Sequence, residues 1–490
     1  MNLDVGLDYA PDADITTAGV VTDCSAFVPT TSGYIGAPAP ANVGMATLAA
    51  DCRGAAATVL LDNTTRLFAG TQTKLYERSG LTWTDVSAGT YTGGAENRWR
   101  FAQWGNSTIA TNYVDAMQVS TSSGAFSALA GTPPKAAGVF TVGDFLMYFD
   151  YDDGTAYPDG WGVSGIGNIE EHDTTDVATQ AARGRLLDLP GQIRAGGRLG
   201  KQAVLYKENG LWLGTYQGPP TVWSWQLVPG NAGCVSQEAL VEVTVNGGNA
   251  HLFLGEDDIY LFDGSRPVSI ATNKVRTFYQ NNASHQYRYK SMASHDRLNA
   301  VIRFYFVSKN GGTTEPDMCL VYNYRTNQWG RDDREIHSAL QYITASISWD
   351  DLGTYYSTWD DLPAVAYNSP FWSAAQETPA IFDTSNDLQS LTGASTASSF
   401  TTGYLGDQND YTTVQRTRLK YNGVTTATGT ATHLFLHELG ESDTTGMTVT
   451  LDGNKFDLLC SARWHKFQID LAGDYKVTGL NFTYEVDGDE

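Results

Sequence analysis

Short apolar runs, each followed by a cluster of turn-forming residues, recur along most of the chain. The segment 57–87, ATVLLDNTTRLFAGTQTKLYERSGLTWTDVS, predicts four strands with turns at Asp62-Asn63 and Ser79-Gly80 among them. Helical periodicity is nearly absent from the sequence. This pattern predicts an all-β protein built from short strands.

Related blocks follow one another along the sequence. Each begins with a buried strand, turns at Gly or Asn into a strand with aromatic residues, and often ends in Trp or Phe. The blocks are residues 57–87, 98–129, 136–165, 192–227, 239–270 and 287–333. Their spacing of roughly 35–50 residues is typical of β-propeller blades. We therefore expect a β-propeller of six blades over residues 45–395, with a late strand at 379–391 closing the last blade. A string of sandwich hairpins is the alternative interpretation.

The stretch LFLGEDDIYLFDGSRPVSI, residues 252–270, raises the question of whether its acids line an active site. Leu252–Leu254 and Ile259–Phe262 predict strands. Gly255–Asp258 and Asp263-Gly264 predict the turns that follow them. The acids are therefore expected in solvent-exposed turns of one scaffold hairpin.

The two ends of the chain have a different pattern. Residues 1–44 include VPTTSGYIGAPAPANVG, which is rich in Pro, Gly and Ala and predicts an extended N-terminal arm. The run GASTASS, residues 393–399, has the composition of a linker. Residues 396–490 alternate cleanly between apolar and polar positions, with LDGNK as a hairpin turn, and predict a separate small β-sandwich.

A short internal repeat interrupts the predicted propeller at about residues 345–365. SWDDL occupies residues 348–352 and TWDDL occupies residues 358–362. The pattern predicts buried Trp and Leu with exposed Asp-Asp pairs. It suits either a binding loop or a self-packed surface excursion.

Composition agrees with this organisation. The chain has 490 residues, of which 41% are hydrophobic, so a folded protein is expected, and a core of this size is built most easily from repeats. Aromatic residues reach 12% and there are 50 glycines, which favours short strands and frequent turns over helices.

The charge balance is strongly acidic. There are 54 Asp and Glu against 31 Lys and Arg, giving a formal net charge of −23. Grooves that grip nucleic acid need clustered cations, so such a groove is not expected. Nucleic acid could still pass an acidic channel wall, because like charges repel and prevent it from adhering.

The five widely spaced cysteines and the N-terminal segment indicate the cellular compartment in which the chain is synthesised. No C-x-x-C occurs, so neither a disulfide framework nor a zinc site is expected, and synthesis in a reducing cytoplasm fits best. The start MNLDVGLDYAPDAD is acidic where a signal peptide is basic. No run of 18 apolar residues exists, so no stable membrane insertion is expected.

Two local patterns are partly similar to metal-binding motifs. His433 and His437 fall on one face of a strand without an H-E-x-x-H frame, so solvated strand histidines are expected. DYDDGT, residues 150–155, departs from the EF-hand pattern because Gly154 stands at its fifth position, where Asp or Asn is required. An acidic turn is expected there instead of a calcium site.

Enzyme signatures are also missing from the sequence. ERSGLTWTDV is similar to the Asp-box turn of sialidase propellers, but the residue five before Trp83 is Arg78 and not Asp. No G-x-S-x-G, P-loop or Rossmann glycine pattern occurs, and no carboxylate pair is singled out. The sequence therefore predicts no enzyme, no cofactor, and no catalytic, cofactor-binding or metal-binding residue.

Several segments together resemble the tail nozzle proteins (tail hub or tail tubular proteins) of short-tailed, podovirus-like bacteriophages. The start DADITTAGVVTDCSAFVPTTSGYIGAPAP resembles the family's N-terminal arm. RWRFAQWGNSTIATNYVDAMQV and DDIYLFDGSRPVSIATNKV resemble an early and a later blade segment. The paired WDDL resembles a linker repeat, and ARWHKFQIDLAGDYKVTGLNFTYEVDGDE resembles the C-terminal strand pattern. The resemblance covers most of the chain.

The resemblance implies a structural virion protein of the phage tail, synthesised in the host cytoplasm. Its β-propeller and β-sandwich would assemble as a homohexameric ring that extends the portal and its adaptor protein. The ring would form the distal tube for DNA ejection, with genomic DNA passing through its lumen without specific binding, and tail fibres or spikes would dock around it. Two other classes stay open. A glycan-degrading propeller predicts converging carboxylates at its mouth, and a receptor-binding module predicts exposed aromatics near the WDDL repeats or on the sandwich.

Overall fold

The computed structural model describes residues 2–488 except 246, 344–357, 359–376 and 424. Its internal contacts divide the chain into two compact units. We call residues 42–228 and 336–391 the blade unit. We call residues 1–41, 229–335 and 392–490 the sandwich unit. The WDDL repeats lie outside the described residues, apart from Thr358.

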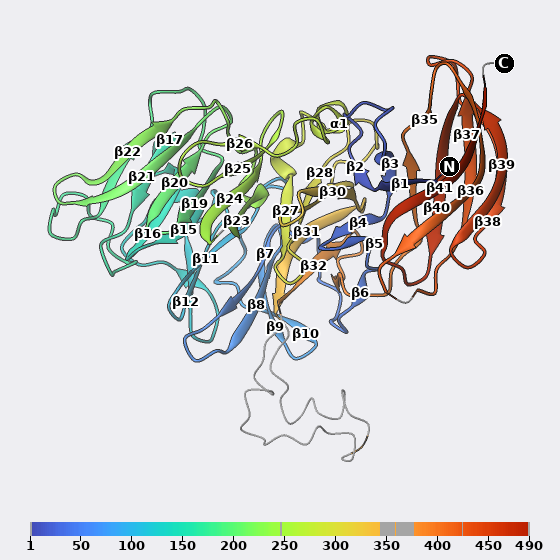
Figure 1. The fold of residues 1–490 in the computed structure, drawn as a ribbon. Coiled ribbons are helices and arrows are strands. Elements are labelled where there is room, and N and C mark those ends of the chain that lie inside the picture. Colours follow the sequence, from blue (N-terminus) through green and yellow to red (C-terminus); the bar gives the residue numbers. More distant parts are fainter. Residues whose placement is uncertain (1, 246, 344–357, 359–376, 424, 489–490) are drawn as a thin grey trace. The chain divides into compact units, whose positions relative to one another are not determined.

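The blade unit consists of small antiparallel sheets of four strands (Figure 1). Four of these sheets are made by consecutive strands, in the orders β7–β10, β11–β14, β15–β18 and β19–β22. A fifth runs β31, β32, β33 and then β6 from the N-terminal side of the chain. The strands are β7 (Ala55–Val59), β8 (Thr65–Gly70), β9 (Leu75–Ser79), β10 (Thr82–Asp85), β11 (Arg100–Trp104), β12 (Ser107–Thr111), β13 (Gln118–Thr121), β14 (Ser127–Ala128), β15 (Lys135–Val142), β16 (Phe145–Asp152), β17 (Ala156–Val163), β18 (Ala182–Arg185), β19 (Ala195–Leu199), β20 (Gln202–Tyr206), β21 (Leu211–Gly218), β22 (Val222–Val228), β31 (Ile336–Ile343), β32 (Glu377–Asp383), β33 (Leu388–Ser390) and β6 (Ala41–Asn42).

Tight turns join the strands within each sheet. In the first sheet, Asn63 lies in the β7–β8 turn at φ 66° and Gly80 lies in the β9–β10 turn at φ 58°. Asn and Gly tolerate this left-handed backbone better than other residues. The four strands and the turns predicted for residues 57–87 are therefore confirmed.

Apolar cores fill the space between neighbouring sheets of the blade unit. One core combines Met147, Phe149 and Trp161 from β16 and β17 with Leu205 and Trp212 from β20 and β21, and all five are at most 6% exposed. Similar cores lie between β7–β10 and β11–β14 and between β11–β14 and β15–β18. The hydrophobic burial that stabilises this unit is thus mainly between sheets.

The sandwich unit contains one further four-stranded sheet, β23–β26, and two larger sheets. The ten-stranded sheet runs β27-β28-β29-β30-β4-β5-β41-β36-β39, with β1 also paired to β41. The seven-stranded sheet runs β2-β3-β34-β40-β37-β38, with β35 also paired to β40. The strands are β1 (Asn2–Gly6), β2 (Asp8–Tyr9), β3 (Val20–Ser25), β4 (Phe27–Thr30), β5 (Gly33–Gly36), β23 (Leu240–Val245), β24 (Gly248–Leu254), β25 (Ile259–Phe262), β26 (Val268–Ser269), β27 (Met292–Asp296), β28 (Val301–Phe306), β29 (Met318–Asn323), β30 (Gln328–Arg331), β34 (Ser398–Thr402), β35 (Leu405–Gly406), β36 (Tyr411–Tyr421), β37 (Thr428–Leu436), β38 (Thr444–Thr450), β39 (Lys455–Ala462), β40 (Trp464–Ala472) and β41 (Val477–Gly488).

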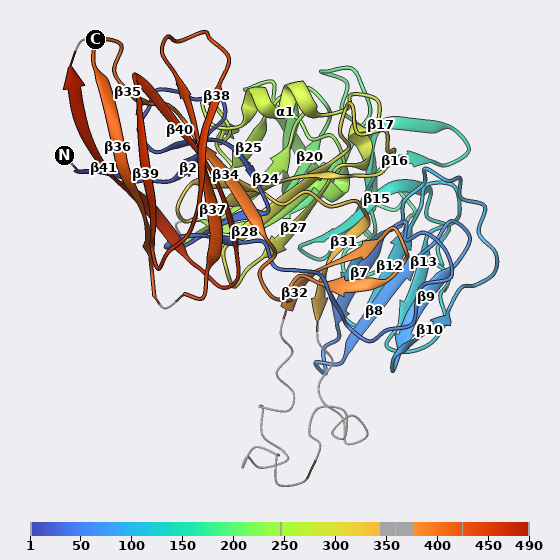
Figure 2. The ribbon, with the colours of Figure 1, turned by 90° about the vertical axis from the view of Figure 1, so that its right-hand side faces the viewer.

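The two larger sheets pack face to face at the C-terminal end of the chain, where β36, β39 and β41 run beside β37, β38 and β40 (Figure 2). Phe467 of β40 and Phe482 of β41 pack across the interface with ring centroids 5.1 Å apart. Phe400 of β34 stacks on Phe27 of β4 at 4.8 Å. These contacts make a sandwich with an aromatic interior.

The N-terminal segment differs from the expected extended arm. Residues 1–44 supply β1 to β6, and five of these strands pair with the C-terminal half of the chain: β1 with β41, β3 with β34, β4 with β30, β5 with β41, and β6 with β33. Gly330 makes the pairing of β4 with β30 possible, because a Cβ at this position would lie 2.2 Å from the carbonyl oxygen of Phe27. The Pro, Gly and Ala content that suggested a loose arm therefore belongs to short, closely packed strands.

The fold is all-β, a six-bladed β-propeller of small sheets with an added β-sandwich. The fold class predicted from the sequence is confirmed. β27–β30 repeat the four-strand antiparallel order inside the larger sheet. Helices are short among the described residues: α1 (Arg276–Asn282) and the 3-10 turns η1 (Gln237–Ala239) and η2 (Arg288–Lys290).

Candidate functional site

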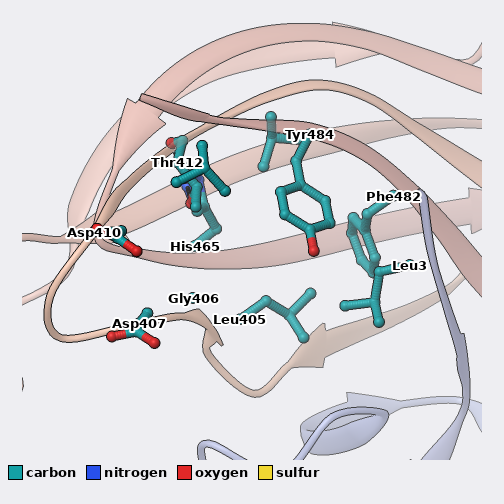
Figure 3. A pocket seen from close by; sticks show the side chains of 11 residues that line it. Leu3, Leu405, Gly406, Asp407, Asp410, Thr412, His465, Phe482 and Tyr484 are labelled. Carbon is teal, nitrogen blue, oxygen red and sulfur yellow. Dashed lines mark hydrogen bonds between the residues drawn. The ribbon is translucent and has the colours of Figure 1, made fainter. Parts of the chain in front are cut away.

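A cavity of about 270 Å³ opens at one end of the sandwich (Figure 3). It lies where the chain leaves β35, which pairs with β40 in one sheet, and enters β36 in the other sheet. Its walls come from β1, β35, β36, β40, β41 and the loop 407–410. The lining residues are Leu3, Leu405, Gly406, Asp407, Asp410, Thr412, Val414, His465, Phe482, Tyr484 and Val486. We call it the sandwich pocket.

Gly406 shapes the entrance of the sandwich pocket. A Cβ at this position would lie 1.8 Å from the carbonyl oxygen of Arg463, and its φ of +149° also favours glycine. The amide of Asp407 then donates to that same carbonyl at 3.2 Å. β35 is thus held tightly against β40, and the chain departs from the seven-stranded sheet directly after it.

One end of the pocket is acidic and the rest is apolar. Asp407 and Asp410 lie at the same end of the cavity, away from Leu3 and Phe482 (Figure 3). The carboxylate of Asp407 accepts the Asn409 amide at 2.7 Å, which fixes the loop. The lining residues include no lysine or arginine to neutralise these carboxylates. The pocket therefore suits a group that is apolar on one side and cationic on the other.

His465 forms part of the pocket floor and belongs to a buried hydrogen-bonded chain. Its Nε2 lies 2.9 Å from the carbonyl oxygen of Thr412, and its Nδ1 lies 2.9 Å from Nε2 of His433. A carbonyl only accepts, so Nε2 of His465 donates and its Nδ1 accepts from His433. Nδ1 of His433 is then unprotonated, and it is buried without a hydrogen-bond partner in the described structure.

Both histidines are neutral at pH 7. His433 and His465 are 0% and 1% exposed, and desolvation lowers the pKa of each imidazole to about 4. The expectation of solvated strand histidines is therefore wrong for His433, whose ring stacks on Phe435 and packs at a tilt against Phe467. His437 lies beyond the end of β37 and is exposed. The signal that sequence reasoning missed was the second buried histidine, His465, on the neighbouring strand.

The acidic turn predicted at residues 150–155 is present, but Asp150 is buried in the preceding strand. Asp152 and Gly154 form the β16–β17 turn, in which the Asp152 carboxylate accepts the Gly154 amide at 2.8 Å. Asp150 instead lies in β16 at a strained φ of 49° and is only 9% exposed. Burial raises the pKa of its carboxyl to about 7.

The hairpin around residues 252–270 is largely as predicted. β24 ends at Leu254, β25 spans Ile259–Phe262, and the Gly255 amide donates to the carbonyl of Asp258 at 2.8 Å. Asp258 is not in solvent, however, because it is 2% exposed and forms an ion pair with Arg276 at 3.3 Å. This acid therefore ties the hairpin to α1.

The remaining sequence motifs take structural places. Arg78 and Trp83 face each other across the β9–β10 hairpin. Within the described part of the chain, no group of three or more His, Cys, Asp or Glu side chains is arranged to hold a metal ion. No helix in that part has both the length and the apolar character needed to cross a membrane.

Comparison with known proteins identifies no family. No family model matches the chain, and no curated protein matches it. Several solved structures are similar to the chain at low sequence identity. YCF48 bound to the D1 peptide is 11% identical over 72% of this chain and 97% of its own, with a TM-score of 0.38. The computationally designed Ika8 protein is 9% identical over 79% and 98%, with a TM-score of 0.36. The exo-β-1,3-galactanase of Phanerochaete chrysosporium, solved with galactose, is 10% identical over 91% and 100%, with a TM-score of 0.27.

Proposed function

We propose that this chain is a structural virion protein that forms the distal nozzle ring of a short phage tail. In this role six copies form a conduit for genome ejection, join the portal-adaptor protein, and present docking surfaces for fibres or spikes. The segments whose sequence resembles tail nozzle proteins support the proposal, together with one feature of the sandwich unit.

That feature is the continuity of the ten-stranded sheet. The four-strand unit β27–β30 continues through β4 and β5 into β41, β36 and β39 of the sandwich. Backbone hydrogen bonds therefore run unbroken from a blade-like sheet to the C-terminal sandwich. A part that transmits force during ejection benefits from such a connection, since a flexible linker would let its modules move independently.

The N-terminal segment that carries part of the resemblance makes this connection. β4 pairs with β30 at Phe27 and Arg331, and β5 pairs with β41 at Tyr34 and Val477. Tyr34 is fully buried, and its hydroxyl donates to the carbonyl of Trp329 at 3.0 Å. The segment thus joins the blade-like sheet to the sandwich, which supports the proposed role.

The acidic balance suits a conduit for DNA. Duplex DNA carries about one negative charge per 1.7 Å, so a cationic wall would hold it at many points. With 54 acids against 31 bases, we expect acids to outnumber Lys and Arg among lumen-facing side chains. Purified protein should show no measurable binding to duplex DNA at physiological salt.

The decisive experiment is electron microscopy of the purified chain, alone and mixed with its adaptor protein. Negative-stain images should show rings, and mass spectrometry should detect the chain in purified virions. A chain absent from virions would overturn the proposed role. A ring whose lumen is lined mainly by Arg and Lys would overturn only the electrostatic part.

A further inference from the structure

The sandwich pocket has the properties of a socket for one apolar side chain and a neighbouring cation. Its volume of about 270 Å³ lies just below the roughly 300–1,000 Å³ of pockets that take drug-sized ligands. Leu3, Leu405 and Phe482 supply apolar walls, and Asp407 and Asp410 supply negative charge at one end (Figure 3). A complementary partner therefore presents an apolar side chain directly beside Lys or Arg.

The same chain presents such a pair on an exposed hairpin tip. Leu298, between β27 and β28, is 72% exposed and follows Arg297, which is also exposed. Among the large hydrophobic side chains exposed in the described structure, Leu298 is the one with Lys or Arg as an immediate neighbour in sequence. Five others lie beside an acid, which the pocket would repel: Ile15, Leu61, Val177, Leu187 and Leu439. Val486 is itself a lining residue of the pocket.

The hairpin tip is held rigid by its own hydrogen bonds. The carboxylate of Asp296 accepts the Asn299 amide at 3.0 Å and its side-chain nitrogen at 2.8 Å. Asp296 is 7% exposed, so the tip is anchored on a buried acid. The Tyr324 amide also donates to the carbonyl of Ala300 at 3.1 Å. A preordered tip loses little conformational entropy on binding.

We propose that the hairpin tip 296–300 of one copy inserts Leu298 into the sandwich pocket of the next copy. Arg297 then faces Asp407 and Asp410. Neither Arg297 nor Leu298 lines the pocket of its own chain. Socket and tip are different patches of one subunit, so the contact is heterologous, and repetition of it generates a ring or an open filament. This inference rests on the proposed ring and names one of its interfaces.

The first test measures self-association of the full chain by sedimentation velocity. Leu298→Asp places an acid against the acidic pocket, and we expect it to raise the dissociation constant at least tenfold. The matched control is Leu61→Asp, at another exposed hairpin position, which should leave association unchanged. Both sites are at the surface, and circular dichroism verifies that each variant folds.

The second test uses charge reversal. Arg297→Glu should weaken association, and Asp407→Lys with Asp410→Lys should weaken it as well. Combining all three substitutions in one chain should recover a substantial part of the lost affinity, because the charges are exchanged and not removed. High salt should weaken the wild-type contact.

A mixing test identifies the heterologous arrangement. A chain with Leu298→Asp keeps its socket, and a chain with Asp407→Lys and Asp410→Lys keeps its tip. Mixed together, they should form a dimer with one intact interface and nothing larger.

The outcomes separate this inference from the proposed function. Rings that persist in Leu298→Asp overturn the interface and leave the nozzle role standing. A wild-type chain that stays monomeric at its highest soluble concentration also overturns the interface, while detection of the chain in virions still decides the role. Saturable binding of a monosaccharide or a foreign peptide in the pocket, with unchanged self-association of the Leu298→Asp variant, would assign the pocket to another ligand.

Discussion

The blade unit and the sandwich are both antiparallel β-structure, but they assemble from the chain in different ways. All four strands β15–β18 fall within residues 135–185 and are joined in order. In the sandwich, Asn2 of β1 pairs with Thr483 of β41, and Cys24 of β3 pairs with Phe400 of β34. Four sheets of the blade unit form from local hairpins, whereas the sandwich closes only when strands from both ends of the sequence meet.

This difference has an energetic meaning. Closing a longer loop costs more conformational entropy, and pairing of distant segments slows folding. The blades can gain stability sheet by sheet from their shared cores. The sandwich gains it in one step when the N-terminal strands dock. Damage to a blade should therefore stay local, whereas damage to a docked N-terminal strand should affect the whole sandwich.

The largest effect is expected from Phe27→Ala. Phe27 is fully buried, and its ring centroid lies 4.4 Å from Tyr34 and 4.8 Å from Phe400. Truncation should lower the free energy of unfolding of the sandwich by about 3–5 kcal/mol. Hydrogen exchange should show lost protection in β34 and β41, with β16 of the blade unit unchanged. The exposed control Leu61→Ala should change stability by less than about 0.5 kcal/mol. Equal loss of protection in β16 would contradict the separation of the two regions.

The next largest effect is the loss of folding stability at acidic pH. The pKa values of His433 and His465 are lowered to about 4 in the folded sandwich, against 6.5 for an ordinary histidine. The unfolded chain therefore binds more protons between these values, and stability falls as pH drops from about 6.5 towards 4. At pH 5 each histidine should cost about 1–2 kcal/mol relative to pH 7. Chemical denaturation at both pH values measures this loss, and the double variant His433→Phe with His465→Phe should show a smaller pH dependence. An unchanged dependence would mean that other groups control acid sensitivity.

A smaller, local effect is expected in a blade from Glu77→Ala. Glu77 forms an ion pair with Arg66 at 2.6 Å, and Arg66 also donates to Ser120 of the neighbouring sheet at 2.9 Å. The substitution leaves the buried guanidinium without its carboxylate. We expect a loss of about 2 kcal/mol, less than for a fully buried pair because Glu77 is one-fifth exposed. Exchange should increase in β8 and β13 and not in β41. Glu441→Ala, at an exposed site of the sandwich unit, is the matched control.

The smallest effect is expected at a blade turn. Gly143 joins β15 to β16 at φ +54°, and a Cβ added there would meet no atom within 4 Å. Gly143→Ala should cost about 1 kcal/mol because Ala disfavours this backbone, and Gly143→Asn should cost less. Thermal unfolding of both variants measures which substitution lowers the stability more. A larger loss for Asn than for Ala would show that side-chain packing, and not backbone strain, decides this position.

The same contrast explains what the sequence could predict. Strands such as Leu252–Leu254 and Ile259–Phe262 were recognisable because each hairpin is complete within a short window. The N-terminal residues predict only an arm, because the partners of β1 and β3 lie in the last 100 residues and leave no local signal. Phe27 and Tyr34 show the burial that the Pro and Gly content concealed.

The sandwich pocket could not have been predicted for the same reason. Its wall combines Leu3 from one end of the chain with Tyr484 from the other, and its floor uses His465. Histidine spacing within one strand drew attention to His433 and His437, while the actual partner of His433 lies across the sheet. Buried acids such as Asp258 were also missed, because a run of acids in sequence gives no sign of which member pairs with a cation.

The pairing of β1 with β41 also sets the order of events during synthesis. β1 leaves the ribosome long before its partner β41 is translated. At about 5–20 residues per second, the N-terminal strands wait roughly 25–100 s for the C-terminal strands to emerge. The blades made of consecutive strands can form in that interval, but the sandwich cannot close before β41 emerges. A product truncated before β41 would therefore lack the closed sandwich, so docking of the N-terminal strands depends on synthesis of β41.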